Sequence, residues 1–206
     1  MLHQSRRDAR AAQDSAETGI ALSIEHGFVE SLADAISLRG WALAMQGFSE
    51  EGITQLQEGL AASRANGYEL MRPYFLTLLA DACIAAGRLD DGREALTSAL
   101  AVANEHADRH NDSEIYRLKG ELLLRQDDLN GAEAQNCFEQ AIKFAWRQNA
   151  KSLELRATTS LGRLLETQNR RDEAHAMLAE IYNWFAEGFD TADLRHAKAL
   201  LDELSA

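Results

Sequence analysis

The chain has 206 residues, of which 46% are hydrophobic, and its formal net charge is −12. A single proline in this length disfavours an architecture built from many strands and turns. The negative charge opposes binding to nucleic acids and anionic membranes, and the sequence has no uninterrupted run of about 18 apolar residues to span a bilayer. We therefore expect an all-α cytoplasmic protein that binds neither nucleic acid nor membrane.

Small residues recur at a fixed spacing and indicate structural repeats. One series recurs at intervals of 40, 40 and 42 residues and consists of Gly40, Ala80, Gly120 and Gly162. A second series has the same spacing and consists of Gly19, Gly59, Ala99 and Ala141. Two series per period predict two helices per repeat, helix A and helix B. Such a hairpin cannot bury its apolar face alone, so the repeats are expected to stack.

The predicted helices follow this spacing from the N-terminus. Residues 14–27 match a helix B, so the chain is expected to begin inside a repeat and to be a fragment of a longer polypeptide. In the first complete repeat, helix A is predicted at 29–46 and helix B at 49–66, with Ser49 as the N-cap of helix B. In the second, Pro73 is placed in the first turn of helix A. It should kink the chain if the residues from Tyr68 are helical.

The C-terminal half continues the series with a longer period. The predicted helices are 89–105, 113–126, 131–148, 151–168 and 171–187, and a last helix at 191–204 is capped by Asp190 or Thr191. The two extra residues of the 42-residue interval predict a longer turn before Phe138. The last helix has one apolar face, formed by Leu194, Ala197, Leu200, Leu201 and Leu204, as expected of a lid over the final repeat.

These helices define one domain over residues 1–206. Its parts are a partial repeat at 1–27, complete repeats at about 28–67, 68–107, 108–149 and 150–188, and a capping helix at 190–205. Helix A should end in each repeat at a residue that tolerates a positive φ angle. The corresponding pairs are Gly47-Phe48, Gly87-Arg88, Asp127-Asp128 and Asn169-Arg170.

This pattern resembles that of tetratricopeptide (TPR) repeats, which have a small residue in helix A, a glycine at the first turn and small and large anchors in helix B. The anchors here are Gly52 with Leu56, Gly92 with Leu96, Ala134 with Phe138, and Ala174 with Leu178. The resemblance implies a right-handed superhelix of antiparallel helix pairs. The period exceeds the usual 34 residues by about six, which predicts longer helices.

Three segments resemble a narrower family, namely the C-terminal TPR array of bacterial proteins that join a class III adenylate or guanylate cyclase domain to a predicted signalling ATPase. The segments are 72–92, 114–124 and 184–204. The resemblance implies a non-catalytic regulatory scaffold whose partners are a peptide, a protein or the attached cyclase and ATPase domains. The alternative is a ligand-sensing domain that controls an output domain such as a transcription activator.

In TPR arrays, a concave groove is lined by helix A residues at fixed distances from the small residue. The corresponding residues here are Asp34, Ser37, Trp41, Tyr74, Thr77, Asp81, Ile84, Glu114, Arg117, Glu121, Arg156 and Arg163. An exposed aromatic residue gives a large contact area at a low entropic cost, so Trp41 is the leading anchor for a partner. The alternative is that Trp41 is covered by preceding repeats. The lysine and asparagine clamp of chaperone-binding TPR domains is not found at these positions.

Other motifs have a structural explanation that we prefer to a catalytic or metal-binding one. The spacing of Gly47 and Gly52, repeated 40 residues later, imitates a phosphate-binding loop, but Ile53 stands where the lysine must be. His106 and His110, with Asp108 and Asp112, could share a helix face and hold a metal, but a solvated loop is favoured. Cys83 and Cys137 are expected to be reduced core residues. No cofactor and no metal is predicted.

The aromatic residues near the C-terminus bear on the oligomeric state. Trp184, Phe185 and Phe189 either lie under the last helix, which we favour, or form a patch through which the chain dimerises.

Overall fold

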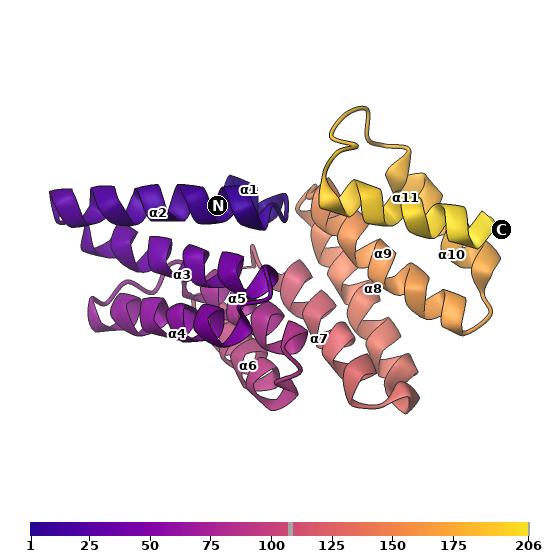
Figure 1. The fold of residues 1–206 in the computed structure, drawn as a ribbon. Coiled ribbons are helices and arrows are strands. Elements are labelled where there is room, and N and C mark those ends of the chain that lie inside the picture. The colour runs from indigo at the N-terminus through magenta and orange to yellow at the C-terminus, as the bar shows by residue number, and fades with distance from the viewer. Residues whose placement is uncertain (107–108, 206) are drawn as a thin grey trace. The chain divides into compact units, whose positions relative to one another are not determined.

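The computed structural model describes residues 1–106 and 109–205, which form helices and no strand (Figure 1). The helices are α1 (Leu2–Ser5), α2 (Ala9–His26), α3 (Val29–Met45), α4 (Ser49–Ala65), α5 (Arg72–Ala85), α6 (Leu89–Glu105), α7 (Asp112–Gln126), α8 (Gly131–Arg147), α9 (Lys151–Thr167), α10 (Arg171–Tyr182) and α11 (Ala192–Ser205). A short 3-10 helix, η1 (Asp128–Asn130), lies between α7 and α8. The all-α prediction is confirmed.

The chain forms two compact units, Met1–Asp108 and Arg109–Ala206. In the first, each helix from α2 to α6 packs against the next, and α3 also packs against α5. In the second, α7 to α11 pack in the same order, and α9 contacts both α7 and α11. Each unit therefore contains helix pairs in which one helix A also contacts the next helix A.

The turn from helix A to helix B has the predicted left-handed residue in three repeats. The φ angles are 96° at Gly47, 77° at Gly87 and 59° at Asn169. The next amide then bonds to a carbonyl inside the finished helix, as in Phe48 to Leu43 at 3.0 Å. The same turn recurs at Arg7, whose φ angle is 56° and which lies 40 residues before Gly47.

The fourth of these turns differs from the prediction. Asp127 has an extended backbone with a φ angle of −163°, and its carboxylate accepts a hydrogen bond from the Leu129 amide at 2.9 Å. The connection runs through η1 over residues 127–130, whereas the other three connections cover 46–48, 86–88 and 168–170. The longer turn in this repeat is confirmed, but a left-handed residue at its start is wrong because the 3-10 helix reverses the chain instead.

Small residues allow close approach where helix A crosses helix B. A Cβ atom on Gly40 would lie 2.6 Å from the Gly52 carbonyl oxygen and 2.7 Å from the Leu56 amide nitrogen of α4. A Cβ atom on Gly120 would lie 2.5 Å from the ring of Phe138 in α8. These distances are too short for any side chain, so the first series of small residues marks the crossing points of the helix pairs.

The capping helix closes the core of the second unit, as predicted. Its apolar face is buried and joins one cluster with side chains of α8, α9 and α10. The buried members from α11 are Leu194, Ala197, Leu200, Leu201 and Leu204.

Three predicted details of the helix ends can be compared with the structure. Ser49 is the first residue of α4 and not its cap, because Phe48 holds the N-cap position without a side-chain hydrogen bond. Pro73 lies in the first turn of α5, as predicted, and residues 68–71 are not helical, so no kink arises. Helix α10 ends at Tyr182 and not at Glu187, since the chain turns back toward α11 through Gly188, whose φ angle is 79°.

The connection from α10 to α11 leaves aromatic side chains in contact with solvent. Trp184 is 60% exposed and Phe189 is 47% exposed, whereas Phe185 is partly buried against the core. Our preferred prediction that all three lie under the last helix is therefore wrong for Trp184 and Phe189. The early end of α10 explains the difference, because the two residues lie on a loop and not on a packed helix face.

Candidate functional site

The residues predicted to line a groove lie on the four A helices. Asp34, Ser37 and Trp41 are on α3, Tyr74, Thr77, Asp81 and Ile84 are on α5, Glu114, Arg117 and Glu121 are on α7, and Arg156 and Arg163 are on α9. We call these twelve positions the helix A row. Ser37, Thr77 and Ile84 are buried, and the two hydroxyl groups donate to backbone carbonyls of their own helices. These three side chains are structural and cannot line a surface.

Trp41 is fully buried, with 0% of its surface exposed. Its indole Nε1 donates a hydrogen bond to Asp81 Oδ2 at 3.3 Å. The prediction that Trp41 is an exposed anchor for a partner is therefore wrong. The 40-residue spacing between Trp41 and Asp81 is the signal in the sequence that could have indicated this pairing, since it places the two side chains at the same position of neighbouring repeats.

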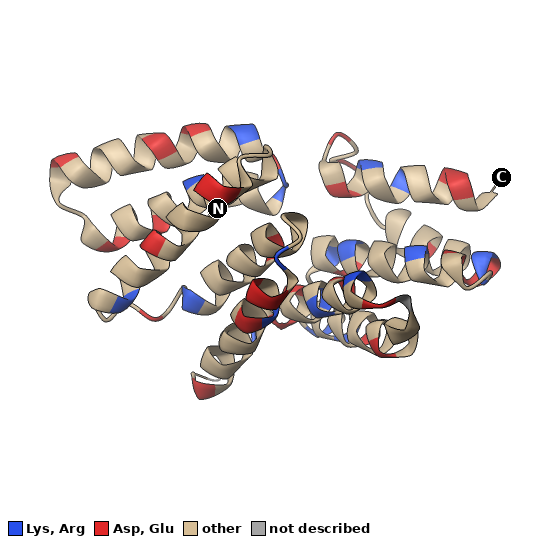
Figure 2. Ribbon diagram, turned by 60° about the horizontal axis from the view of Figure 1, so that its bottom comes forward, with Lys and Arg blue, Asp and Glu red and all other residues tan. Residues whose placement is uncertain are grey.

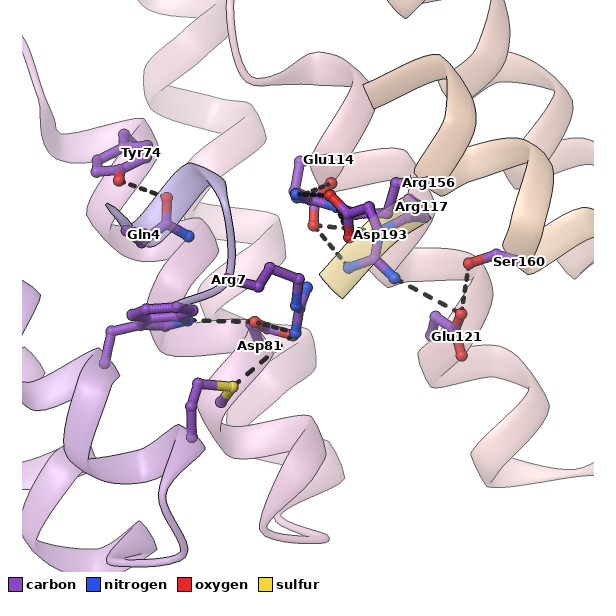
Figure 3. A network of polar contacts seen from close by, with 12 residues as sticks. Gln4, Arg7, Tyr74, Asp81, Glu114, Arg117, Glu121, Arg156, Ser160 and Asp193 are labelled. Atoms are coloured by element: carbon purple, nitrogen blue, oxygen red, sulfur yellow. Dashed lines mark hydrogen bonds and ion pairs between the residues drawn. The ribbon is translucent and has the colours of Figure 1, made fainter. Parts of the chain in front are cut away.

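Two residues from the N-terminal segment complete a polar network in the first unit (Figure 3). Arg7 pairs with Asp81 Oδ2 at 3.3 Å and also lies 3.9 Å from the sulfur of Met45. The hydroxyl of Tyr74 donates to Gln4 Oε1 at 2.8 Å. Sequence reasoning placed Tyr74 and Asp81 in the row but missed Gln4 and Arg7, because nothing local in the first seven residues specifies a contact with α5.

A second network joins α7, α9 and α11 in the second unit (Figure 3). Arg117 contacts Glu114 at 2.6 Å and Glu121 at 3.6 Å. Arg156 contacts Glu114 at 3.3 Å from one guanidinium nitrogen and Asp193 of α11 at 2.7 Å from another.

The network ends at Ser160, whose hydroxyl donates to Glu121 at 2.7 Å. Sequence reasoning missed Ser160 and Asp193. Arg163, the remaining predicted residue of α9, is exposed.

The second network leaves an excess of negative charge. Three carboxylates, from Glu114, Glu121 and Asp193, surround two guanidinium groups. The side chain of Glu121 is 33% exposed and is the most accessible of these acids. Elsewhere in the described part of the chain, basic residues are interspersed with acidic ones along the helices (Figure 2). This surface can offer carboxylates to a basic partner.

Asp34 differs from the other acids of the row because its Oδ1 atom is buried and accepts no hydrogen bond from any described residue. Burial, together with the nearby charge of Glu30, raises the pKa of the Asp34 carboxyl to about 6. Asp34 lines a cavity of about 220 Å³ in the first unit. The other residues of this cavity are Met1, His3, Ala12, Ser15, Ala16, Gly19, Ser31, Ala35 and Leu38.

The remaining motifs gain no chemical role from the structure. His106 follows α6 as an exposed residue, and Asp108 lies outside the described residues. Among the described residues, no three His, Cys, Asp or Glu side chains are grouped to hold a metal ion. Cys83 and Cys137 are buried free thiols, and burial raises the pKa of Cys83 to about 11. In the same part of the chain, no helix is both long and apolar enough to cross a membrane.

Comparison with known proteins defines the fold. No protein-family profile matches the sequence, and no curated protein is detectably similar to it. The structure of BtubC (BKLC) from P. vanneervenii is similar at a TM-score of 0.63 and 18% identity, over 98% of this chain and 89% of that one. The TPR-like repeats of a Podosopora anserina protein described as a kinesin light chain match at a TM-score of 0.52 and 16% identity, over 98% and 95%.

A single-substitution variant of the same repeats gives a TM-score of 0.54 and 17% identity, over 87% of this chain and 92% of that one. At these identities the likeness concerns the fold alone. The chain has a TPR-like helical repeat fold, and the predicted fold class is confirmed. The resemblance to cyclase-linked arrays stays a prediction.

Proposed function

We propose that the chain is a protein-interaction module that binds a basic peptide or protein segment along the helix A row. The TPR-like fold supports an interaction scaffold in general. The observation that carries the proposal is the network of Glu114, Glu121 and Asp193 around two arginines. Its ion pairs hold carboxylates in fixed positions, so a partner with lysine or arginine side chains would find them already oriented.

The wider setting is also a proposal and rests on the sequence. The three segments that resemble cyclase-linked arrays support a cytoplasmic bacterial signalling protein in which this chain regulates or assembles attached cyclase and ATPase domains. In that setting the chain itself performs no catalysis.

A test of this function uses the whole chain as bait in a quantitative pull-down from cytoplasm. The double variant Glu121→Gln, Arg163→Gln changes two accessible charges of the row. The matched control Glu139→Gln, Arg147→Gln changes two exposed charges of α8, a helix B. We expect a partner that is retained by the control and weakened at least tenfold by the row variant. Identical recovery by both variants would contradict binding at the row.

The second candidate is a ligand-sensing domain, which the cavity beside Asp34 favours. A small molecule that binds the folded chain raises its melting temperature in proportion to the logarithm of its concentration. A thermal-shift survey of small metabolites separates the two functions, since an interaction scaffold gives a flat response and a sensor a positive one.

Self-association through the exposed Trp184 and Phe189 is a further proposal for the partners of this chain. Light scattering on the double variant Trp184→Ser, Phe189→Ser tests it. A dimer that becomes a monomer with unchanged helicity would support the patch, and an unchanged molecular mass would remove it.

A further inference from the structure

We propose that the cavity lined by α1, α2 and α3 is a pocket for a lysine side chain of the partner, whose ammonium group pairs with Asp34. This proposal rests on the proposed function and adds to it the residue type that the first unit recognises.

The shape of the cavity limits what it can hold. Its volume of about 220 Å³ is below the roughly 300–1,000 Å³ of typical small-molecule pockets. Small apolar residues, Ala12, Ala16, Gly19 and Ala35, form much of its wall. One unbranched apolar stem fits such a wall better than a ring or a branched group.

The chemistry of the cavity favours a cation at its end. Oδ1 of Asp34 is shielded from solvent and accepts no hydrogen bond from a described residue. A buried carboxylate without a donor is costly, and a donor with a positive charge removes most of that cost. Ser15 and Ser31, which also line the cavity, can accept the remaining N–H bonds of an ammonium group.

Lysine suits this arrangement better than arginine. A lysine ammonium is a compact point charge on a flexible stem, whereas a guanidinium is a planar fork that needs acceptors in its own plane. The exposed acids elsewhere in the row can bind arginine, but the cavity beside Asp34 is narrow and offers a single carboxylate.

The test compares two peptides that differ only in the ammonium group. The ¹⁵N-labelled whole chain is titrated with acetyl-Gly-Lys-Gly-amide and with the analogue that carries norleucine in place of lysine. We expect saturable shifts of the Gly19 and Ser31 amides with the lysine peptide and none with the norleucine peptide. Equal shifts with both peptides, or no saturable shift with either, would overturn the proposal.

Variants identify the carboxylate responsible. Asp34→Asn should weaken the lysine peptide at least tenfold, whereas Asp90→Asn, which removes an 88% exposed carboxylate of α6, should leave its affinity unchanged. Equal losses in both variants would mean that the peptide responds to the overall charge and would overturn the assignment to Asp34.

The pH dependence adds an independent readout. The titratable neighbours of Asp34 are His3 and the amino group of Met1 from the N-terminal segment, Glu30 from α3, and Tyr68 from the turn after α4. Affinity for the lysine peptide should fall as the pH drops below about 6, because Asp34 then takes up a proton. The His3→Gln variant should keep this loss, and its disappearance there would assign the effect to His3 instead.

A third arm separates lysine from a free amine. If n-butylammonium chloride binds and the lysine peptide does not, the cavity takes small amines, the lysine assignment fails and the sensing function gains support. The pull-down with the row variants alters only the second unit, so a failed cavity test leaves its result standing.

Discussion

Trp41 is a residue whose role changes once its contacts are known. It is fully buried, and its indole bonds to Asp81. We expect Trp41→Ala to lower the free energy of unfolding by about 3–5 kcal/mol, because it removes a large buried side chain and leaves a cavity. Urea unfolding followed by circular dichroism measures this change. Trp184→Ala, at a 60% exposed position, should cost less than about 1 kcal/mol, and a similar cost for both would contradict the described burial.

Asp34 gives a pH-dependent prediction. Its folded-state pKa of about 6 exceeds the ordinary value of 3.8, so the folded chain loses stability as the pH rises between these values. Asp34→Asn should therefore stabilise the chain by about 1–2 kcal/mol at pH 7.5, where the wild-type carboxylate is ionised. The difference should shrink toward zero at pH 4. Urea midpoints at both pH values test this, and a gain that is larger at pH 4 would contradict the sign.

At the scale of the helices, the close approach at Gly40 makes a sharp prediction. Gly40→Ala should destabilise the first unit by about 2–4 kcal/mol, since its Cβ would overlap backbone atoms of α4 that cannot move alone. Gly19→Ala is the matched control, because its Cβ would lie an ordinary 3.4 Å from Ala35. There the lower backbone entropy of alanine should give a gain of up to about 1 kcal/mol. Thermal unfolding of both variants would distinguish the two cases.

The attachment of α11 can be tested through the ion pair of Asp193 with Arg156. Both side chains are about one-tenth exposed, so Asp193→Ala leaves a guanidinium with less compensation in a largely buried site. We expect a loss of about 1–3 kcal/mol. Lys198→Ala, which breaks an exposed pair on the same helix, should cost less than about 0.5 kcal/mol. Hydrogen exchange in α11 should increase in the first variant and remain unchanged in the second.

The helices were predictable from the sequence because each repeat supplies the same local signals. Gly47 and Gly87 end helix A through their own φ angles, and Gly40 lies next to a leucine-rich stretch that one period reproduces. The early end of α10 was not predictable in this way. It depends on where α11 packs, and the residues between Tyr182 and Gly188 have no local signal as strong as a repeat landmark.

The candidate site was only partly predictable, for a different physical reason. Repeat positions identify which helix a residue belongs to and which side it faces. They do not show which polar groups meet, and Arg7 and Asp193 come from segments outside the regular repeats. Whether Trp41 is covered depends on those segments, so its burial required the folded structure.

At the scale of the whole molecule, the two units differ in what surrounds their polar networks. In the first, the N-terminal residues Gln4 and Arg7 contact the A helix α5. In the second, α11 supplies Asp193 to the A helix α9. In both units, a segment outside the regular helix pairs therefore fixes side chains of the helix A row.

The burial of Trp41 also gives the chain an optical reporter. Trp41 belongs to the first unit, whereas Trp146 and Trp184, which are 66% and 60% exposed, belong to the second. Unfolding should therefore shift the emission of Trp41 to longer wavelengths and change the other two little. Fluorescence then follows the first unit, while circular dichroism follows both. We expect the two midpoints in urea to differ, and coincident midpoints would show that the units melt as one.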